Sequence, residues 1–187
     1  MTDEVLYKTK WLSLHRIKDD AKGVHGYDYS HEDRCDGQII AILPYRIVGG
    51  LREYLLRKEI TPCWDLDKQV VSSITGGYEG GDVKDDVIRE LDEEAGYTIT
   101  KEQIKTLGTC RGTKSCDTIY HLFTVDLTNQ EKHNAAGDGS ELEAAAKCFW
   151  AKDVLGAEDP IVYTMFVRLQ HMNEQKEIPD LFTKKAI

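Results

Sequence analysis

The sequence lacks several features that mark large classes of proteins. Its longest apolar run, residues 39–43, is far too short to cross a bilayer, which takes about 20 residues. Residues 1–4 have neither the basic segment nor the apolar segment of a secretory signal peptide. No internal repeat and no low-complexity tract stands out. A membrane-spanning, exported or repeat protein is therefore not expected.

Basic charge is also scarce. The chain has 24 Lys and Arg against 33 Asp and Glu, a net charge of -9 at pH 7. This balance argues against a nucleic-acid groove and against an anionic membrane surface. It does not exclude a nucleotide substrate, because bound Mg²⁺ can reverse the local potential. The expected partner is therefore a small molecule, with no nucleic acid and no membrane. The 187 residues suit one domain with an ample core.

Paired cysteines are absent as well. The number of cysteines is odd and no C-x-x-C pair occurs; the five are Cys35, Cys63, Cys110, Cys116 and Cys148. This usage predicts reduced thiols and a cytoplasmic location. Cys110 and Cys116 could pair, although two loop thiols are the preferred interpretation.

The sequence does contain a glycine-rich loop, residues 76–81, followed by a helix expected over residues 83–95. Helical residues advance by about 100° each, so Glu90, Glu93 and Glu94 fit within an arc of roughly 100°. Like charges at this spacing destabilise a helix by about 0.2–0.5 kcal/mol per pair. A divalent cation would turn the repulsion into attraction, and oxygen ligands favour Mg²⁺ or Mn²⁺ over zinc.

The alternative is a solvated acidic face, which is common on helices. The neighbouring residues argue against it, because an apolar stripe beside the carboxylates predicts a helix docked on a core. The stripe consists of Val87, Ile88, Leu91 and Ala95. Gly96 is placed to end the helix, and Arg89 to pair with Glu93.

The remaining pattern predicts strands around this helix. A strand over residues 6–17, a turn at 18–23 and a second strand containing Tyr27 and Tyr29 predict an N-terminal hairpin. Further strands are expected at residues 38–45, 53–58, 70–74, 104–109, 118–127 and 147–151, with a turn at Gly49-Gly50. Residues 128–140 are polar and predict a loop, and residues 160–176 predict a closing helix. Strands on both sides of one helix imply α+β or mixed α/β layering.

The helix resembles the signature of the Nudix hydrolases. The second half of that signature reads Arg-Glu-apolar-x-Glu-Glu-x-Gly-apolar, and it is matched here by Arg89, Glu90, Leu91, Glu93, Glu94, Gly96 and Tyr97. The first half departs, because Gly81 stands where the family has a glutamate. If the loop is one residue shorter than the family's, Asp82 replaces that glutamate and Gly76 is the leading glycine.

The resemblance implies a fold and a reaction. The fold would be a Nudix-type α/β/α sandwich with a mixed sheet over residues 35–187, preceded by a β-hairpin extension over residues 1–34. The reaction would be hydrolysis of a pyrophosphate that links a nucleoside to a second group. Glu90 and Glu94 would be the main ligands of Mg²⁺ or Mn²⁺, Glu93 a third and Gly76 beside them. Arg89 would orient a glutamate.

The flanks are similar to the ADP-ribose (ADP-sugar) pyrophosphatase group. Residues 10–14, 36–44 and 137–141 occupy the places of its tryptophan-bearing strand, its core strand and its Gly-Asp-Gly loop. In that group the hairpin crosses to a second subunit and its aromatics stack on adenine, which implies a homodimer. Trp11, Tyr27 and Tyr29 are therefore candidates for substrate stacking; the alternative for Trp11 is a core or dimer contact.

Other roles stay open. Glu141, and after it Glu143, is the candidate general base, against the alternative of a solvated loop carboxylate. Glu79 is a further candidate base or ligand. Arg57 or Lys58 could clamp phosphate, and Arg111 could bind phosphate or ribose or lie plainly on the surface.

The expected activity is therefore Mg²⁺-dependent cleavage of ADP-ribose or another ADP-sugar to AMP and a sugar phosphate. One alternative keeps the enzyme class and changes the substrate to a GDP-sugar, NADH or a dinucleoside polyphosphate. The other is a nucleotide-sensing module that binds without turnover.

Overall fold

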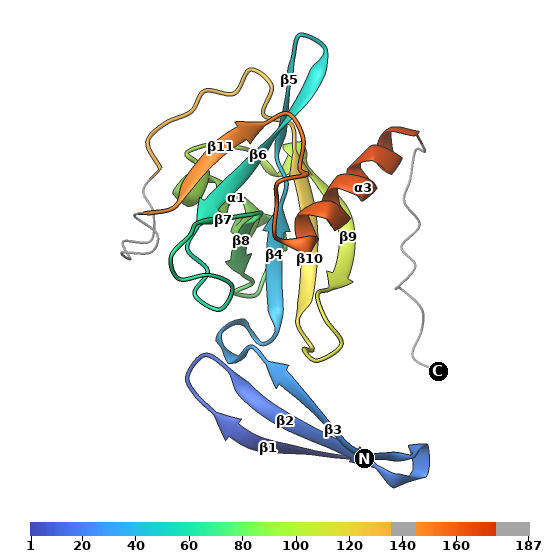
Figure 1. Cartoon of the computed structure of the whole chain (residues 1–187). Helices are drawn as coiled ribbons and strands as arrows, with labels where there is room; N and C mark the ends of the chain where they lie inside the picture. The colour runs from blue at the N-terminus through green and yellow to red at the C-terminus, as the bar shows by residue number, and fades with distance from the viewer. Residues whose placement is uncertain (136–144, 175–187) are drawn as a thin grey trace.

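The computed structural model describes residues 1–135 and 145–174 and places two sheets between two helices (Figure 1). The first sheet has the strand order β8-β4-β10-β9, in which β4 and β10 run parallel and the other pairs antiparallel. Its strands are β4 (Gln38–Ile42), β8 (Ile74–Gly77), β9 (Ile104–Arg111) and β10 (Ile119–Val125). The second sheet is antiparallel, with β6 at its centre. It consists of β5 (Tyr45–Val48), β6 (Leu51–Glu59), β7 (Val70–Ser72) and β11 (Lys147–Ala151).

Alternation along the strands divides the core into two layers. In β4 the side chains of Ile40 and Ile42 pack in one cluster with Val87 of helix α1 (Val83–Glu90). Ala41 belongs to the other cluster, with Met165 of helix α3 (Pro160–Glu174). Successive strand residues point to opposite faces, so each helix covers one face of the sheets. The result is an α/β/α sandwich.

The N-terminus forms a separate three-stranded antiparallel sheet, which Figure 1 shows beyond one end of β4 and β10. Its strands are β1 (Thr2–Lys8), β2 (Ser13–Asp19) and β3 (Val24–His31). The expected strand over residues 6–17 is wrong, because a turn divides it. The Thr9 hydroxyl accepts hydrogen bonds from the backbone N–H of Trp11 (3.1 Å) and of Leu12 (2.9 Å). A local side-chain acceptor of this kind competes with the strand ladder.

Other boundaries follow the sequence more closely. Gly49 and Gly50 have φ of 58° and 83°, which is the left-handed turn expected between β5 and β6. The single strand expected over residues 38–45 divides at Pro44, which has no N–H for the ladder. β11 and the start of α3 lie where they were expected. Short 3₁₀ turns occupy Asp20–Lys22, Asp33–Cys35 and Lys101–Gln103.

All five cysteines are free thiols, as predicted. No helix in the described ranges combines the length and the apolar character that a bilayer crossing needs.

Candidate active site

The helix that carries the glutamates begins at a capped end. Asp82 is the N-cap of α1 and accepts a hydrogen bond from the Lys84 backbone N–H at 3.1 Å. Lys101 lies 2.8 Å from the same side chain and lowers the pKa of Asp82. Asp82 therefore caps the helix and does not line the cavity that holds the glutamates.

The last turn of this helix is wider than expected. The helix predicted over residues 83–95 is confirmed in its bounds, but its α-helical part, α1, ends at Glu90, and Leu91–Ala95 form a π turn. The turn ends at Gly96, which has a φ of 72° and donates to Asp92 O and Leu91 O. Leu91 and Ala95 are both fully buried, so the wide turn keeps the apolar stripe on the core. Single π turns recur at functional sites.

The helical glutamates Glu90, Glu93 and Glu94 line one cavity of about 340 Å³, here called the glutamate pocket. A fourth glutamate, Glu79 of the preceding loop, lines it too. The other lining residues are Arg34, Cys35, Thr75, Gly76, Gly77, Tyr78 and Arg89. The exposed fraction of the side chains rises from 8% for Glu90 through 13% for Glu94 to 40% for Glu93. The carboxylates that the sequence placed on one helix face therefore meet in one concave site.

Gly76 forms the floor beneath Glu90. It lies in β8 opposite Ile40, and a Cβ at this position would overlap the Glu90 carboxylate. Burial raises the pKa of Glu90, and the Arg89 guanidinium, 2.7 Å away, opposes that shift. A glycine is thus required here for close approach, not for backbone conformation.

Two arginines hold the carboxylates. Arg89 lies 2.7 Å from Glu90 and 3.3 Å from Glu93 and so contacts both carboxylates. Arg57 of β6 is 5% exposed and forms an ion pair with Glu94. Arg57 does not line the glutamate pocket, so it touches the site through Glu94.

The carboxylate oxygens of the glutamate pocket have the chemistry that a hard divalent cation requires. Carboxylate oxygens are the ligands that Mg²⁺ and Mn²⁺ prefer, and the floor at Gly76 makes room for one of them. In the described residues, however, no group of three or more His, Cys, Asp or Glu side chains has a geometry that could hold a metal ion. The contacts with Arg57 and Arg89 set the present positions of the carboxylates.

A second cavity, of about 620 Å³, lies between the N-terminal sheet and the loop after β9. Tyr27, Tyr29 and Arg111, which the sequence proposed for substrate binding, line it together. We call it the tyrosine cavity. Trp11 is not part of it; this side chain is exposed at the turn between β1 and β2, with Lys10 Nζ 4.2 Å from its ring. Glu141 and Glu143 lie outside the described residues.

A third cavity, of about 590 Å³, shares Arg111 with the tyrosine cavity. It contains Gln38 and His121, whose Oε1 and Nε2 atoms are 2.8 Å apart. The His121 ring lies 5.9 Å from the ring of Tyr78 in the glutamate pocket. Burial lowers the pKa of His121. Sequence reasoning missed this pair, although a histidine within an apolar strand was a usable signal.

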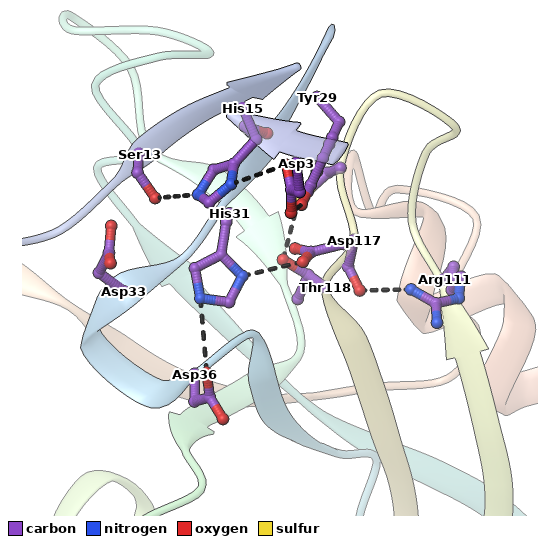
Figure 2. Close-up of polar contacts among 12 residues, drawn as sticks. Asp3, Ser13, His15, Tyr29, His31, Asp33, Asp36, Arg111, Asp117 and Thr118 are labelled. Atoms are coloured by element: carbon purple, nitrogen blue, oxygen red, sulfur yellow. Dashed lines mark hydrogen bonds and ion pairs between the residues drawn. The ribbon is translucent and has the colours of Figure 1, made fainter. Parts of the chain in front are cut away.

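Histidines and aspartates join the N-terminal sheet to the rest of the molecule (Figure 2). His31 at the end of β3 has its Nδ1 2.9 Å from Asp117 and its Nε2 3.6 Å from Asp36. Backbone bonds between Ser30 and residues 115 and 117 add to this contact. The Tyr29 hydroxyl donates to Asp3 at 2.8 Å; burial, followed by Asp3, raises the pKa of Tyr29 to about 12. We call these residues, together with Ser13 and His15 of β2, the junction cluster.

Part of the junction cluster has the order of a nucleophilic triad (Figure 2). Ser13 Oγ lies 2.8 Å from His15 Nε2, and His15 Nδ1 lies 3.3 Å from Asp3. This is the connectivity of a Ser-His-Asp triad. Ser13, however, is only 1% exposed, so no substrate carbonyl can reach its hydroxyl. The arrangement therefore satisfies buried polar groups and does not provide a nucleophile.

The layers and the glutamate-bearing helix define a Nudix-type α/β/α fold, which confirms the expected fold class. A similar solved structure is that of a protein described as an ADP compounds hydrolase, with a TM-score of 0.67 and 14% identity over 95% of each chain. At this identity the similarity establishes the fold. No family model and no curated protein matches the sequence.

Proposed function

We propose that this chain is a Mg²⁺-dependent hydrolase that cleaves the pyrophosphate of ADP-ribose or another ADP-sugar to AMP and a sugar phosphate. The observation that carries the proposal is the glutamate pocket, in which three carboxylates of one helix face a glycine floor. The fold shared with an ADP compounds hydrolase supports the same conclusion.

The glutamates would hold the metal. Glu90, Glu93 and Glu94 are the proposed ligands; Mg²⁺ or Mn²⁺, when bound, supplies charge neutralisation at phosphorus and a more acidic water. Arg89 fixes two of these carboxylates at 2.7 and 3.3 Å. Gly76 leaves room at the pocket wall for the Glu90 carboxylate. Arg34, also on the wall, offers a guanidinium to a phosphate oxygen.

The tyrosine cavity would receive the base. Tyr27 and Tyr29 line it beside Ile17, residue types that suit a planar heterocycle, and Arg111 also lines the third cavity. The Tyr78–His121 contact places that third cavity beside the glutamate pocket. A substrate with a base at one end and a pyrophosphate near the other matches this series of sites.

A panel of substrates tests the proposal. The protein is incubated with Mg²⁺ and ADP-ribose, ADP-glucose, GDP-mannose, NADH, diadenosine polyphosphates or nucleoside triphosphates, and the products are separated by ion-exchange chromatography. We expect AMP and a sugar phosphate from the ADP-sugars. Preferential turnover of another compound would reassign the substrate, and saturable binding without turnover would identify a nucleotide sensor.

We also propose a homodimer formed through the N-terminal sheet. Every residue of β1 is exposed, and Val5, Tyr7 and Leu14 present apolar side chains on this sheet. An edge strand with exposed apolar groups is a surface that a second chain can cover. Multi-angle light scattering at micromolar concentration should give twice the chain mass; a monomer would contradict the dimer.

A further inference from the structure

Arg57 is a buried cation in the middle of a sheet. Its backbone is fixed on both sides, because β6 pairs Arg57 with Cys148 of β11 and with Ser72 of β7. The side chain is 6% exposed. An arginine so far from water needs anionic partners, since an unpaired buried charge is strongly destabilising.

The partners of Arg57 form a chain that ends at the glutamate pocket. One carboxylate is Glu94, which lines the pocket; another is Glu59, whose Oε2 lies 3.2 Å from Arg57 Nε. Ser72 Oγ donates to the other oxygen of Glu59 at 2.7 Å, which holds Glu59 in place. Arg57 therefore lies between a carboxylate anchored on the second sheet and a carboxylate of the π turn.

A divalent cation and Arg57 would compete for Glu94. Arg57 cannot bind a phosphate in the pocket directly, because it does not line it. Arg89, unlike Arg57, lines the pocket; its side chain is 33% exposed and forms ion pairs with Glu90 and Glu93. The geometry points to Arg57 as a positioning residue. It holds Glu94 against β6 and releases this carboxylate to a divalent cation, while Glu59 keeps the guanidinium paired.

This inference rests on the proposed function only in taking Glu94 as a metal ligand, and it explains why the carboxylates stand apart from metal-binding geometry. It also predicts that substitutions of Arg57 and of Glu59 change the affinity for a divalent cation in opposite directions. Loss of Arg57 removes the competitor, so the affinity for a cation should rise. Loss of Glu59 removes the alternative partner, so Arg57 should hold Glu94 more firmly and the affinity should fall.

The experiment measures Mn²⁺ binding by electron paramagnetic resonance and melting temperature with EDTA or Mn²⁺. For Arg57→Gln we expect the Mn²⁺ dissociation constant to fall about tenfold. We also expect a lower melting temperature in EDTA and a larger stabilisation by Mn²⁺ than in the unaltered chain. For Glu59→Gln the dissociation constant should rise severalfold.

Two variants serve as controls. Arg57→Lys retains the charge, so its dissociation constant should stay closer to that of the unaltered chain than Arg57→Gln does. Arg46→Gln breaks a pair in the same sheet, between Arg46 and Glu53 at 2.6 Å, which lies outside the glutamate pocket and should leave Mn²⁺ binding unchanged.

If Arg57→Gln binds Mn²⁺ no more tightly than the unaltered chain, the residue is merely structural and the inference fails. If Arg57→Gln does not fold in EDTA, the Glu59→Gln variant decides. A higher Mn²⁺ dissociation constant for Glu59→Gln supports the inference, and an unchanged one overturns it. Opposite shifts in Mn²⁺ affinity without hydrolysis of any panel substrate would support Arg57 and reject the proposed function. Hydrolysis of a panel substrate with unchanged Mn²⁺ affinities in both variants would support the proposed function and reject the role of Arg57.

Discussion

The glutamate pocket and the junction cluster both gather carboxylates around cationic or titratable partners, but they are built differently. In the pocket three of the four glutamates come from one short helical segment and line a cavity. In the junction cluster Asp3, His31 and Asp117 come from separate segments, and the central hydroxyl, that of Ser13, is buried. Carboxylates that share one helical segment and one cavity indicate chemistry, whereas long-range pairing around a buried hydroxyl indicates assembly.

The largest difference between the two regions is expected when one functional group is removed from each. Glu94→Gln removes a proposed metal ligand, and the rate of ADP-ribose hydrolysis should fall by about 10²–10³-fold or more. Ser13→Ala removes the hydroxyl of the triad-like group and should leave the rate within about twofold, because that hydroxyl is not exposed.

Steady-state kinetics, with circular dichroism to verify folding, would compare the two variants. An active Glu94→Gln would remove the metal assignment, and an inactive but folded Ser13→Ala would mean that the junction cluster contributes to catalysis.

A smaller effect is expected from filling the pocket floor. Gly76→Ala would push the Glu90 carboxylate aside, costing about 1–3 kcal/mol of stability and about 10–100-fold in rate. The matched control is Gly156→Ala, since no atom lies within 4 Å of a Cβ there. Urea denaturation and initial rates measure both. If the two alanines behaved alike, the floor would have no special role.

The junction cluster should affect binding more than rate. His31→Ala removes contacts to Asp117 and Asp36 and should reduce the unfolding free energy by about 1–2 kcal/mol. Because Tyr27 and Tyr29 lie on the same sheet, KM for ADP-ribose should rise several-fold with little change in kcat. His25→Ala, which removes an exposed side chain from β3, is the control. A fall in kcat at constant KM would contradict this division of roles.

The smallest expected effect concerns pH. Burial lowers the pKa of His121 in the folded chain, so the unfolded chain binds the proton more readily. The contribution of His121 to stability is therefore fully present above the ordinary histidine pKa, near 6.5, and is lost as pH falls below that value and through the lowered pKa of the folded chain. Urea titrations between about pH 5 and 8 should show this decline, and His121→Gln should reduce its slope. An unchanged slope would mean that His121 is not the group responsible.

The sequence predicted most of the layers and the helix that carries the acids. Strong periodicity and spacing made this possible, because Glu90, Glu93 and Glu94 lie within one turn or so of each other. The divided N-terminal strand was missed because its cause is one hydroxyl, that of Thr9. The π turn was missed because residue propensities do not distinguish it from a final α turn.

Contacts between distant residues could not be predicted from one sequence. His31 and Asp117 are separated by 86 positions, and nothing in either neighbourhood indicates the other. Arg57 or Lys58 was proposed as a phosphate clamp from the resemblance to relatives; only the fold shows that the Arg57 side chain turns inward to Glu94. The pairing of Gln38 with His121 likewise depends on the parallel alignment of β4 and β10.

The π turn also has a consequence for how this protein can change by insertion and deletion. A π turn accommodates one residue more than an α turn, so removing one residue within Leu91–Glu93 would return the segment to ordinary α-helical spacing. Because the wide turn spreads its extra residue over about the same rotation, Glu94 would turn by only a fraction of one helical step relative to Glu90. A change in chain length of one residue can thus be absorbed within this turn while the site and the sandwich persist, which makes the length of this helix as informative as its composition when related chains are compared.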